Sequence, residues 1–159
     1  MTPTPLYSIN PAGEKFVLPE EKDYQPEFER VKALADRARA NGQEVVVVMG
    51  AGFVGAVMAA VVADTKDKDG RYSKFVIVCQ RPSTRSYWKI PMLNRGVSPV
   101  KSEDPQVDEL IDRCVNREKT LMATFNSDCL ALADCVVVDV QCDFVKQDLG
   151  NMVTGDTDM

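Results

Sequence analysis

The residues best suited to chemistry are three glycines that follow a run of four valines. Gly50, Gly52 and Gly55 form a G-x-G-x-x-G pattern. The valines predict a buried strand and the alanine-rich stretch after the pattern predicts a helix, which is the context a phosphate-binding turn requires. The turn would bind a dinucleotide pyrophosphate, with the helix dipole and the N–H groups near Phe53 and Val54 attracting the phosphates.

Each glycine has a separate expected role in that turn. Gly50 would permit the tight turn after the strand, and Gly52 would let the backbone approach a pyrophosphate. Gly55 would let the helix pack close to the sheet. A strand-turn-helix that binds no ligand is the alternative, and the strand and helix on either side of the glycines favour the phosphate site.

The same stretch is long and apolar enough to suggest a membrane span. Residues 45–63 contain no charged residue, which fits a span by hydropathy alone. Glycines inside a helix, however, each cost about 1 kcal/mol relative to alanine. The flanks also lack the basic cluster and aromatic belt of a span. We therefore expect no membrane association.

The strand predicted at 74–79 ends where the adenosine ribose would bind. NAD-binding folds usually place Asp or Glu there, but this chain has Gln80 followed by Arg81. Gln80 can bond a hydroxyl without repelling a 2′-phosphate, and Arg81 and Arg85 could pair with that phosphate. NAD and NADP both stay open as cofactors, and solvated surface charge is the alternative for the arginines.

Composition excludes several other classes of function. The chain has 159 residues, 45% of them hydrophobic and 27% charged, which fits a globular domain with a real core. A net charge of −5 argues against nucleic-acid binding. No secretory signal is visible, so we expect a cytosolic protein.

The sequence has no histidine, which removes Ser-His and Cys-His catalysis. The five cysteines lack C-x-x-C spacing, so we expect neither disulfides nor a metal site.

Strands and helices alternate along the chain and must position these residues. We expect strands at 44–49, 74–79, 121–124 and 135–140, and helices at 24–40, 53–64, part of 84–95, 105–117 and 128–133. Pro91 should break or kink the third helix. The alternation predicts an α/β fold with a Rossmann-like, doubly wound parallel sheet. Right-handed crossovers give the incomplete strand order 3-2-1-4.

The expected domain organisation is simple. Residues 1–22 are rich in Pro, Thr and Glu and are expected to form an N-terminal arm. Residues 23–159 form the dinucleotide-binding domain, in which the helix at 24–40 is an extra N-terminal helix beside the first strand. The strand at 135–140 should present an open sheet edge that invites self-association into a homo-oligomer.

Four segments in order resemble the nucleotide-sugar dehydrogenases, the UDP-glucose/GDP-mannose dehydrogenase family. They are the glycine segment, Leu-Asn-Arg-Gly-Val-Ser-Pro-Val at 93–100, Leu-Met-Ala-Thr at 121–124 and Leu-Ala-Asp-Cys-Val-Val-Val at 132–138. Together they are more specific than the glycines alone. The resemblance implies the N-terminal NAD-binding domain of an oxidoreductase of polysaccharide biosynthesis. This family oxidises the C6 alcohol of a nucleotide sugar to a carboxylate, in two hydride transfers to NAD.

The resemblance also assigns roles by position. It implies that the pyrophosphate is held by Gly50, Gly52, Phe53, Val54 and Gly55. Gln80 stands at the ribose-binding acid, Arg85 near the adenosine and Thr124 near the nicotinamide half.

A segment beginning with Val140, Gln141 and Cys142 aligns with one that the family often writes Thr-Pro-Thr. Val140 and Gln141 would then contact the cofactor. Cys142 would replace a threonine near the reacting centre, and an inert loop thiol is the alternative for it. No other residue of the chain is a candidate for catalysis.

The helical linker and sugar-nucleotide domain of the family have no counterpart in this sequence. We therefore expect a truncated enzyme that binds the dinucleotide, meets the nucleotide sugar only through absent domains and turns over no sugar alone. One alternative is a non-catalytic nucleotide-binding or regulatory module, which Gln80 and Cys142 favour. Another is the cofactor domain of a different hydride-transfer enzyme.

Overall fold

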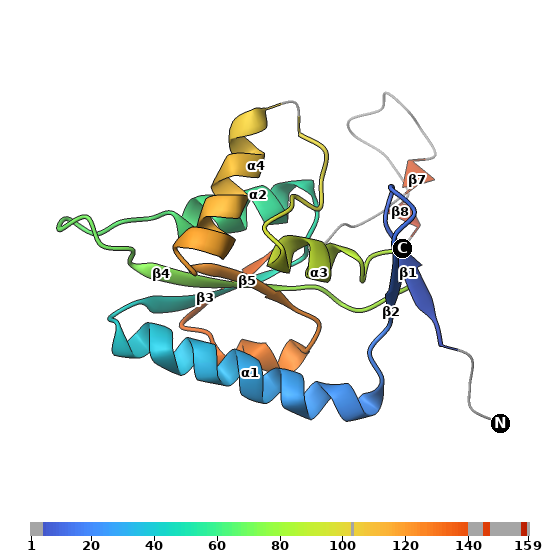
Figure 1. Cartoon of the computed structure of the whole chain (residues 1–159), viewed down its shortest axis with the longest axis horizontal. Helices are drawn as coiled ribbons and strands as arrows, with labels where there is room; N and C mark the ends of the chain where they lie inside the picture. The colour runs from blue at the N-terminus through green and yellow to red at the C-terminus, as the bar shows by residue number, and fades with distance from the viewer. Residues whose placement is uncertain (1–4, 103, 140–144, 147–156, 159) are drawn as a thin grey trace.

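Four parallel strands form the centre of the molecule (Figure 1). The computed structural model describes residues 5–102, 104–139, 145–146 and 157–158. The strands of the central sheet are β3 (Glu44–Met49), β4 (Lys74–Cys79), β5 (Leu121–Thr124) and β6 (Cys135–Val138). Their spatial order is β5-β4-β3-β6, which is the predicted order 3-2-1-4. The α/β, Rossmann-like prediction is confirmed.

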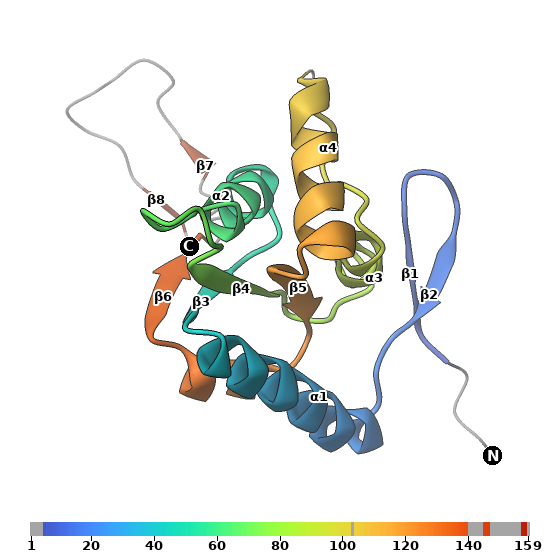
Figure 2. The ribbon, with the colours of Figure 1, turned by 60° about the vertical axis from the view of Figure 1, so that its left-hand side comes forward.

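Helices cover both faces of this sheet (Figures 1 and 2). One face carries α2 (Phe53–Ala63), α3 (Lys89–Asn94) and α4 (Pro105–Asp112), and α4 continues as the π-helix η1 (Arg113–Arg117). The other face carries α1 (Glu21–Ala40) and the 3₁₀ helix η2 (Ser127–Leu132). The valines of β3 alternate between the two faces and are buried on both. This explains their unbroken apolar run.

The short helix α3 begins later than its sequence pattern suggests. Pro91 is its third residue, so the proline lies in the first turn, where its missing N–H is not needed for an intrahelical bond. The proline therefore marks the start of this helix and does not kink it. The helix predicted at 105–117 is present in full as α4 followed by η1.

A β-hairpin occupies part of the N-terminal arm, where no strand was expected. Strands β1 (Tyr7–Ile9) and β2 (Lys15–Val17) pair antiparallel, and their Ser8 and Phe16 are buried. The Trp88 N–H donates to Ser8 Oγ at 3.1 Å. The hairpin is therefore packed against the segment that leads into α3. A second pairing joins β7 (Val145–Lys146) and β8 (Thr157–Asp158).

Candidate functional site

The glycine turn connects β3 to α2 at the carboxyl edge of the sheet. Gly50 has φ +108°, a backbone conformation that glycine adopts without strain. Its N–H donates to the Cys79 carbonyl oxygen at 2.9 Å, which fastens the turn to the end of β4. The turn is thus a built element of the fold and requires glycine at this position.

The helix α2 begins directly against that turn. A Cβ added to Gly55 would lie 2.3 Å from the Gly50 carbonyl oxygen, so no side chain fits there. A Cβ on Gly52, the N-cap residue, would meet only the Asp139 carboxylate, at 3.9 Å. In the part of the chain that the structure describes, no side chain caps the N-terminus of α2. The first N–H groups of this helix therefore remain available to an anion.

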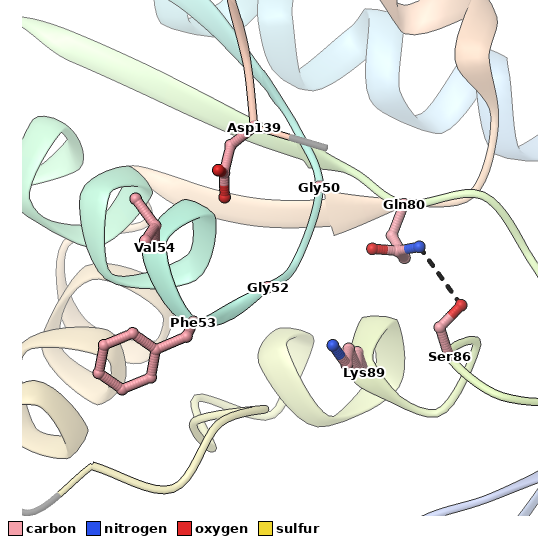
Figure 3. Close-up of a pocket in the computed structure, with 8 residues that line it drawn as sticks. All are labelled: Gly50, Gly52, Phe53, Val54, Gln80, Ser86, Lys89 and Asp139. Atoms are coloured by element: carbon pink, nitrogen blue, oxygen red, sulfur yellow. Dashed lines mark hydrogen bonds between the residues drawn. The ribbon is translucent and has the colours of Figure 1, made fainter. Parts of the chain in front are cut away.

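A hollow of about 610 Å³ opens in front of this helix terminus (Figure 3). Its walls come from the glycine turn, the end of β4, the start of α3 and the end of β6. The lining residues are Gly50, Gly52, Phe53, Val54, Gln80, Ser86, Lys89 and Asp139. The structure thus brings together five residues that the sequence singled out with three that it did not, Ser86, Lys89 and Asp139.

Gln80 holds the glycine turn in place from the end of β4. Its Oε1 accepts a hydrogen bond from the Ala51 N–H at 2.9 Å. Its Nε2 donates to Ser86 Oγ and to the Arg81 carbonyl oxygen, each at 3.3 Å. The amide therefore bridges the turn and the loop before α3, and it still lines the hollow.

Lys89 supplies a positive charge to the same turn. Its Nζ donates to the Ala51 carbonyl oxygen at 3.1 Å. Burial lowers the pKa of the Lys89 ammonium from its ordinary value, because the charged form loses hydration. A phosphate bound beside this ammonium would compensate for that lost hydration.

A second hollow of about 460 Å³ adjoins the first and shares Gly50 and Gln80 with it. Arg81 and Pro82 line it, as do Tyr24 of α1 and Phe125 after β5. The two aromatic rings meet edge to face with centroids 5.2 Å apart. Such walls suit a flat aromatic group, since ring faces and edges both contact it favourably.

Asp139 is the acidic residue at the glycine turn. It follows β6, and its N–H donates to the Met49 carbonyl oxygen at 2.9 Å. Its Oδ2 lies 2.7 Å from the position of a Cβ on Gly55, and Figure 3 shows the carboxylate directed toward the first turn of α2. The clue in the sequence was a charged residue directly after the three consecutive valines of β6.

The other predicted site residues lie elsewhere. Arg81 and Arg85 are exposed, and only Arg81 lines a hollow. Thr124 is fully buried at the end of β5, and its Oγ1 donates to Glu27 Oε1 of α1 at 2.6 Å. Its assignment to the nicotinamide half stays a prediction. The residues Val140, Gln141 and Cys142 lie outside the described residues.

The fold and the site together define a class of protein. The strand order reverses between β3 and β6, and the glycine turn with its uncapped helix lies at that point. In open α/β sheets, ligands bind at such a switch point, and this arrangement is characteristic of dinucleotide-binding folds. None of the described helices is both long and apolar enough to cross a membrane.

Comparison with solved structures points to the same class. The chain is similar to NDP-N-acetyl-D-galactosaminuronic acid dehydrogenase from Methanosarcina mazei Go1, with 31% identity and a TM-score of 0.59. The match covers 75% of this chain and 24% of that enzyme, so the chain spans about a quarter of its length. This confirms the resemblance to nucleotide-sugar dehydrogenases that the sequence motifs indicated.

A second structure found is a UDP-glucose dehydrogenase from the hyperthermophilic archaeon Pyrobaculum islandicum. It has 18% identity and a TM-score of 0.49, over 62% of this chain and 20% of that one. No protein-family model and no curated protein matches the chain.

Proposed function

We propose that this chain is the cofactor-binding part of a nucleotide-sugar dehydrogenase and binds a nicotinamide dinucleotide. The observation that carries the proposal is the uncapped N-terminus of α2, which follows the glycine turn and opens onto a hollow of about 610 Å³. Unbonded N–H groups and the positive end of the helix dipole converge there and favour a phosphate. The structural likeness to a nucleotide-sugar dehydrogenase supports the choice of dinucleotide.

The two adjoining hollows fit the two ends of such a ligand. The pyrophosphate would lie against Gly52 with Lys89 beside it, and the adenine would enter the second hollow, where Tyr24 and Phe125 together form one wall. Gln80 lines both hollows and so would face the adenosine ribose between them. This placement needs no movement of the glycine turn, because Gly52 has no side chain at the point where the phosphates would approach.

NAD is the proposed cofactor and NADP is the alternative. The Gln80 oxygen already accepts a bond from the Ala51 N–H. Because an amide is neutral, it does not discriminate strongly by charge between the 2′-hydroxyl of NAD and the 2′-phosphate of NADP. Arg81 and Arg85 are exposed near the end of β4 and could pair with a 2′-phosphate. The preference for NAD rests on the likeness to the nucleotide-sugar dehydrogenases.

In the complete enzyme, the proposed reaction is oxidation of the sugar C6 alcohol to the carboxylate, with two hydrides passed to NAD. The dinucleotide accepts the hydrides, and this chain binds and orients it. We propose that the chain alone binds the dinucleotide without oxidising a sugar. Among the described residues that line the two hollows, the one thiol belongs to Cys79, and it is buried. These residues therefore offer no exposed thiol to a substrate.

Calorimetric titration with NAD and NADP, together with NADH fluorescence, tests this proposal. We expect saturable binding of NAD, and loss of binding in Gly52→Asp, because the new carboxylate would occupy the pyrophosphate position. The backbone of Gly52 leaves room for a Cβ, so this variant should fold. The matched control is Val61→Asp, which adds the same charge at an exposed position of α2 and should bind as the parent does.

Two outcomes would contradict the proposal. Binding of neither dinucleotide by a folded parent chain would favour a module of the same fold with another ligand. Formation of NADH by this chain in the presence of UDP-glucose would show that it turns over a sugar by itself, contrary to its proposed role as a cofactor-binding part.

A further inference from the structure

An acidic side chain already occupies the space where the pyrophosphate is proposed to bind. Asp139 Oδ2 lies 2.7 Å from the position of a Cβ on Gly55 and 3.9 Å from that of a Cβ on Gly52. The carboxylate therefore lies over the first turn of α2. The positive end of a helix stabilises an acidic side chain just as it stabilises a phosphate.

The backbone at this position is fixed. The Asp139 N–H donates to the Met49 carbonyl oxygen at 2.9 Å, continuing the pairing of β6 with β3. The carboxylate can leave the helix terminus only by rotating about its side-chain bonds. A ligand that brings a pyrophosphate must therefore either displace the carboxylate or tolerate it at close range.

The charge of the hollow follows from this arrangement. Of the described residues that line it, Lys89 is the one cation and Asp139 the one anion. The Lys89 ammonium contacts the far side of the glycine turn, at the Ala51 carbonyl oxygen. The two charges offset each other, so the hollow lacks the net positive charge that would attract an anionic ligand.

We infer that Asp139 competes with the ligand for the phosphate-binding terminus of α2 and thereby sets a low affinity for the dinucleotide. The inference rests on the proposed function and deepens it, since it names the residue that limits how tightly the pyrophosphate is held. The cofactor would then exchange readily, because repulsion between like charges persists in the complex.

The test compares Asp139→Asn with the parent chain, using NADH and ADP-ribose as probes. Asparagine keeps the shape of the side chain and removes its charge. We expect both probes to bind at least about tenfold more tightly, because like charges this close repel by roughly that much in bulk water and by more near a protein surface. The gain should shrink as salt is added, since the repulsion is screened.

The control variant is Glu118→Gln. Glu118 is exposed and directly follows η1, at the opposite edge of the sheet from the glycine turn, so its loss changes net charge alone and should leave the affinity unchanged. Asp139→Ser is a second variant that removes the carboxylate. Thermal unfolding of each variant confirms that it is folded before its affinity is compared.

The outcomes separate the inference from the proposed function. Equal binding by parent and Asp139→Asn would overturn the inference and leave the proposed function intact. A gain with NADH but none with ADP-ribose would also overturn it, because the pyrophosphate is common to both probes. A gain of the same size in Glu118→Gln would likewise count against it. If no folded variant binds either probe, the proposed function fails and the inference fails with it.

Discussion

Gly52 and Gly55 are three residues apart, yet the space around them differs. A Cβ on Gly55 would lie 2.3 Å from a backbone oxygen, and that oxygen belongs to the glycine turn itself. A Cβ on Gly52 would make ordinary contact with one carboxylate oxygen. Gly55 is therefore required by packing, whereas packing leaves room for a Cβ at Gly52, where the proposed pyrophosphate would approach.

This difference predicts opposite effects for two alanine substitutions. Gly55→Ala should destabilise the fold by about 1–3 kcal/mol, as overpacking of a tight contact does. Gly52→Ala should stay within about 1 kcal/mol of the parent but weaken dinucleotide binding, because its methyl group enters the pyrophosphate position. Chemical denaturation gives the stability and calorimetry the affinity. Equal stability losses in the two variants would refute the separation of roles.

At the level of single residues, spacing alone predicted the glycine turn and Gln80, since both follow strands that their valine content makes recognisable. Lys89 and Ser86 escaped prediction because the loop and helix that carry them reach the turn only through tertiary packing. Asp139 lies inside the range 135–140 that was predicted as a strand, whereas β6 ends at Val138. Its place beside the glycine turn depends on which neighbouring strand pairs with β6. That neighbour is known only once the sheet order is known.

Helix α1 is attached to the sheet by partly buried polar contacts as well as by its apolar face. Thr124 Oγ1 donates to Glu27 Oε1 at 2.6 Å, and Arg30 donates to both oxygens of the same carboxylate at 2.8 Å. The Asn126 amide donates to the Tyr24 carbonyl oxygen at 2.8 Å. These bonds fix the helix end that carries Tyr24, one wall of the second hollow.

We therefore expect Thr124→Val to lower the free energy of unfolding by about 1–3 kcal/mol, because Glu27 loses a buried donor. Affinity for the dinucleotide should change little, since the hydroxyl is turned toward α1. Urea denaturation and an NADH titration measure the two quantities. A stable variant with much weaker binding would instead support the role near the nicotinamide that the family resemblance implies.

Thr120→Val is the matched control for that substitution. The Thr120 hydroxyl is also buried, but it has no hydrogen-bond partner of normal geometry within the described ranges. Replacing it by a methyl group should be neutral or slightly stabilising, because no buried partner is left unpaired. A loss as large as that of Thr124→Val would mean that both effects come from the change of residue type.

Among the elements, the four strands and their order were predictable, whereas the hairpin was not. Long β-branched runs identified the strands, and the handedness of crossovers left one order. The segments 7–9 and 15–17 are too short for their alternation to stand out. The hairpin also contacts a distant part of the chain, where the Trp88 backbone N–H donates to Ser8 Oγ. Contacts of that kind join distant segments and leave no local pattern.

At the scale of the whole molecule, the sheet is covered unevenly. Strand β6 pairs with β3 on one side, and no other strand of the described residues pairs with it on the other. Val137 packs into the core on the α2 face, but Val136 and Val138 on the opposite face are 45% and 62% exposed. Helix α1 and η2 cover the β3 side of that face and leave these valines in solvent. An unpaired strand edge beside exposed valines favours pairing with another chain.

We therefore expect the chain to self-associate as its concentration rises, through the edge at β6. Val136→Lys should shift this equilibrium toward the monomer, because a lysine on an edge strand opposes pairing by charge and hydration. Val61→Lys is the matched control, since Val61 is 56% exposed on α2 and away from the edge. Light scattering over a concentration series measures the mass of each variant. A parent chain that stays monomeric throughout would contradict the prediction, and equal dissociation of both variants would assign the association to charge in general, not to β6.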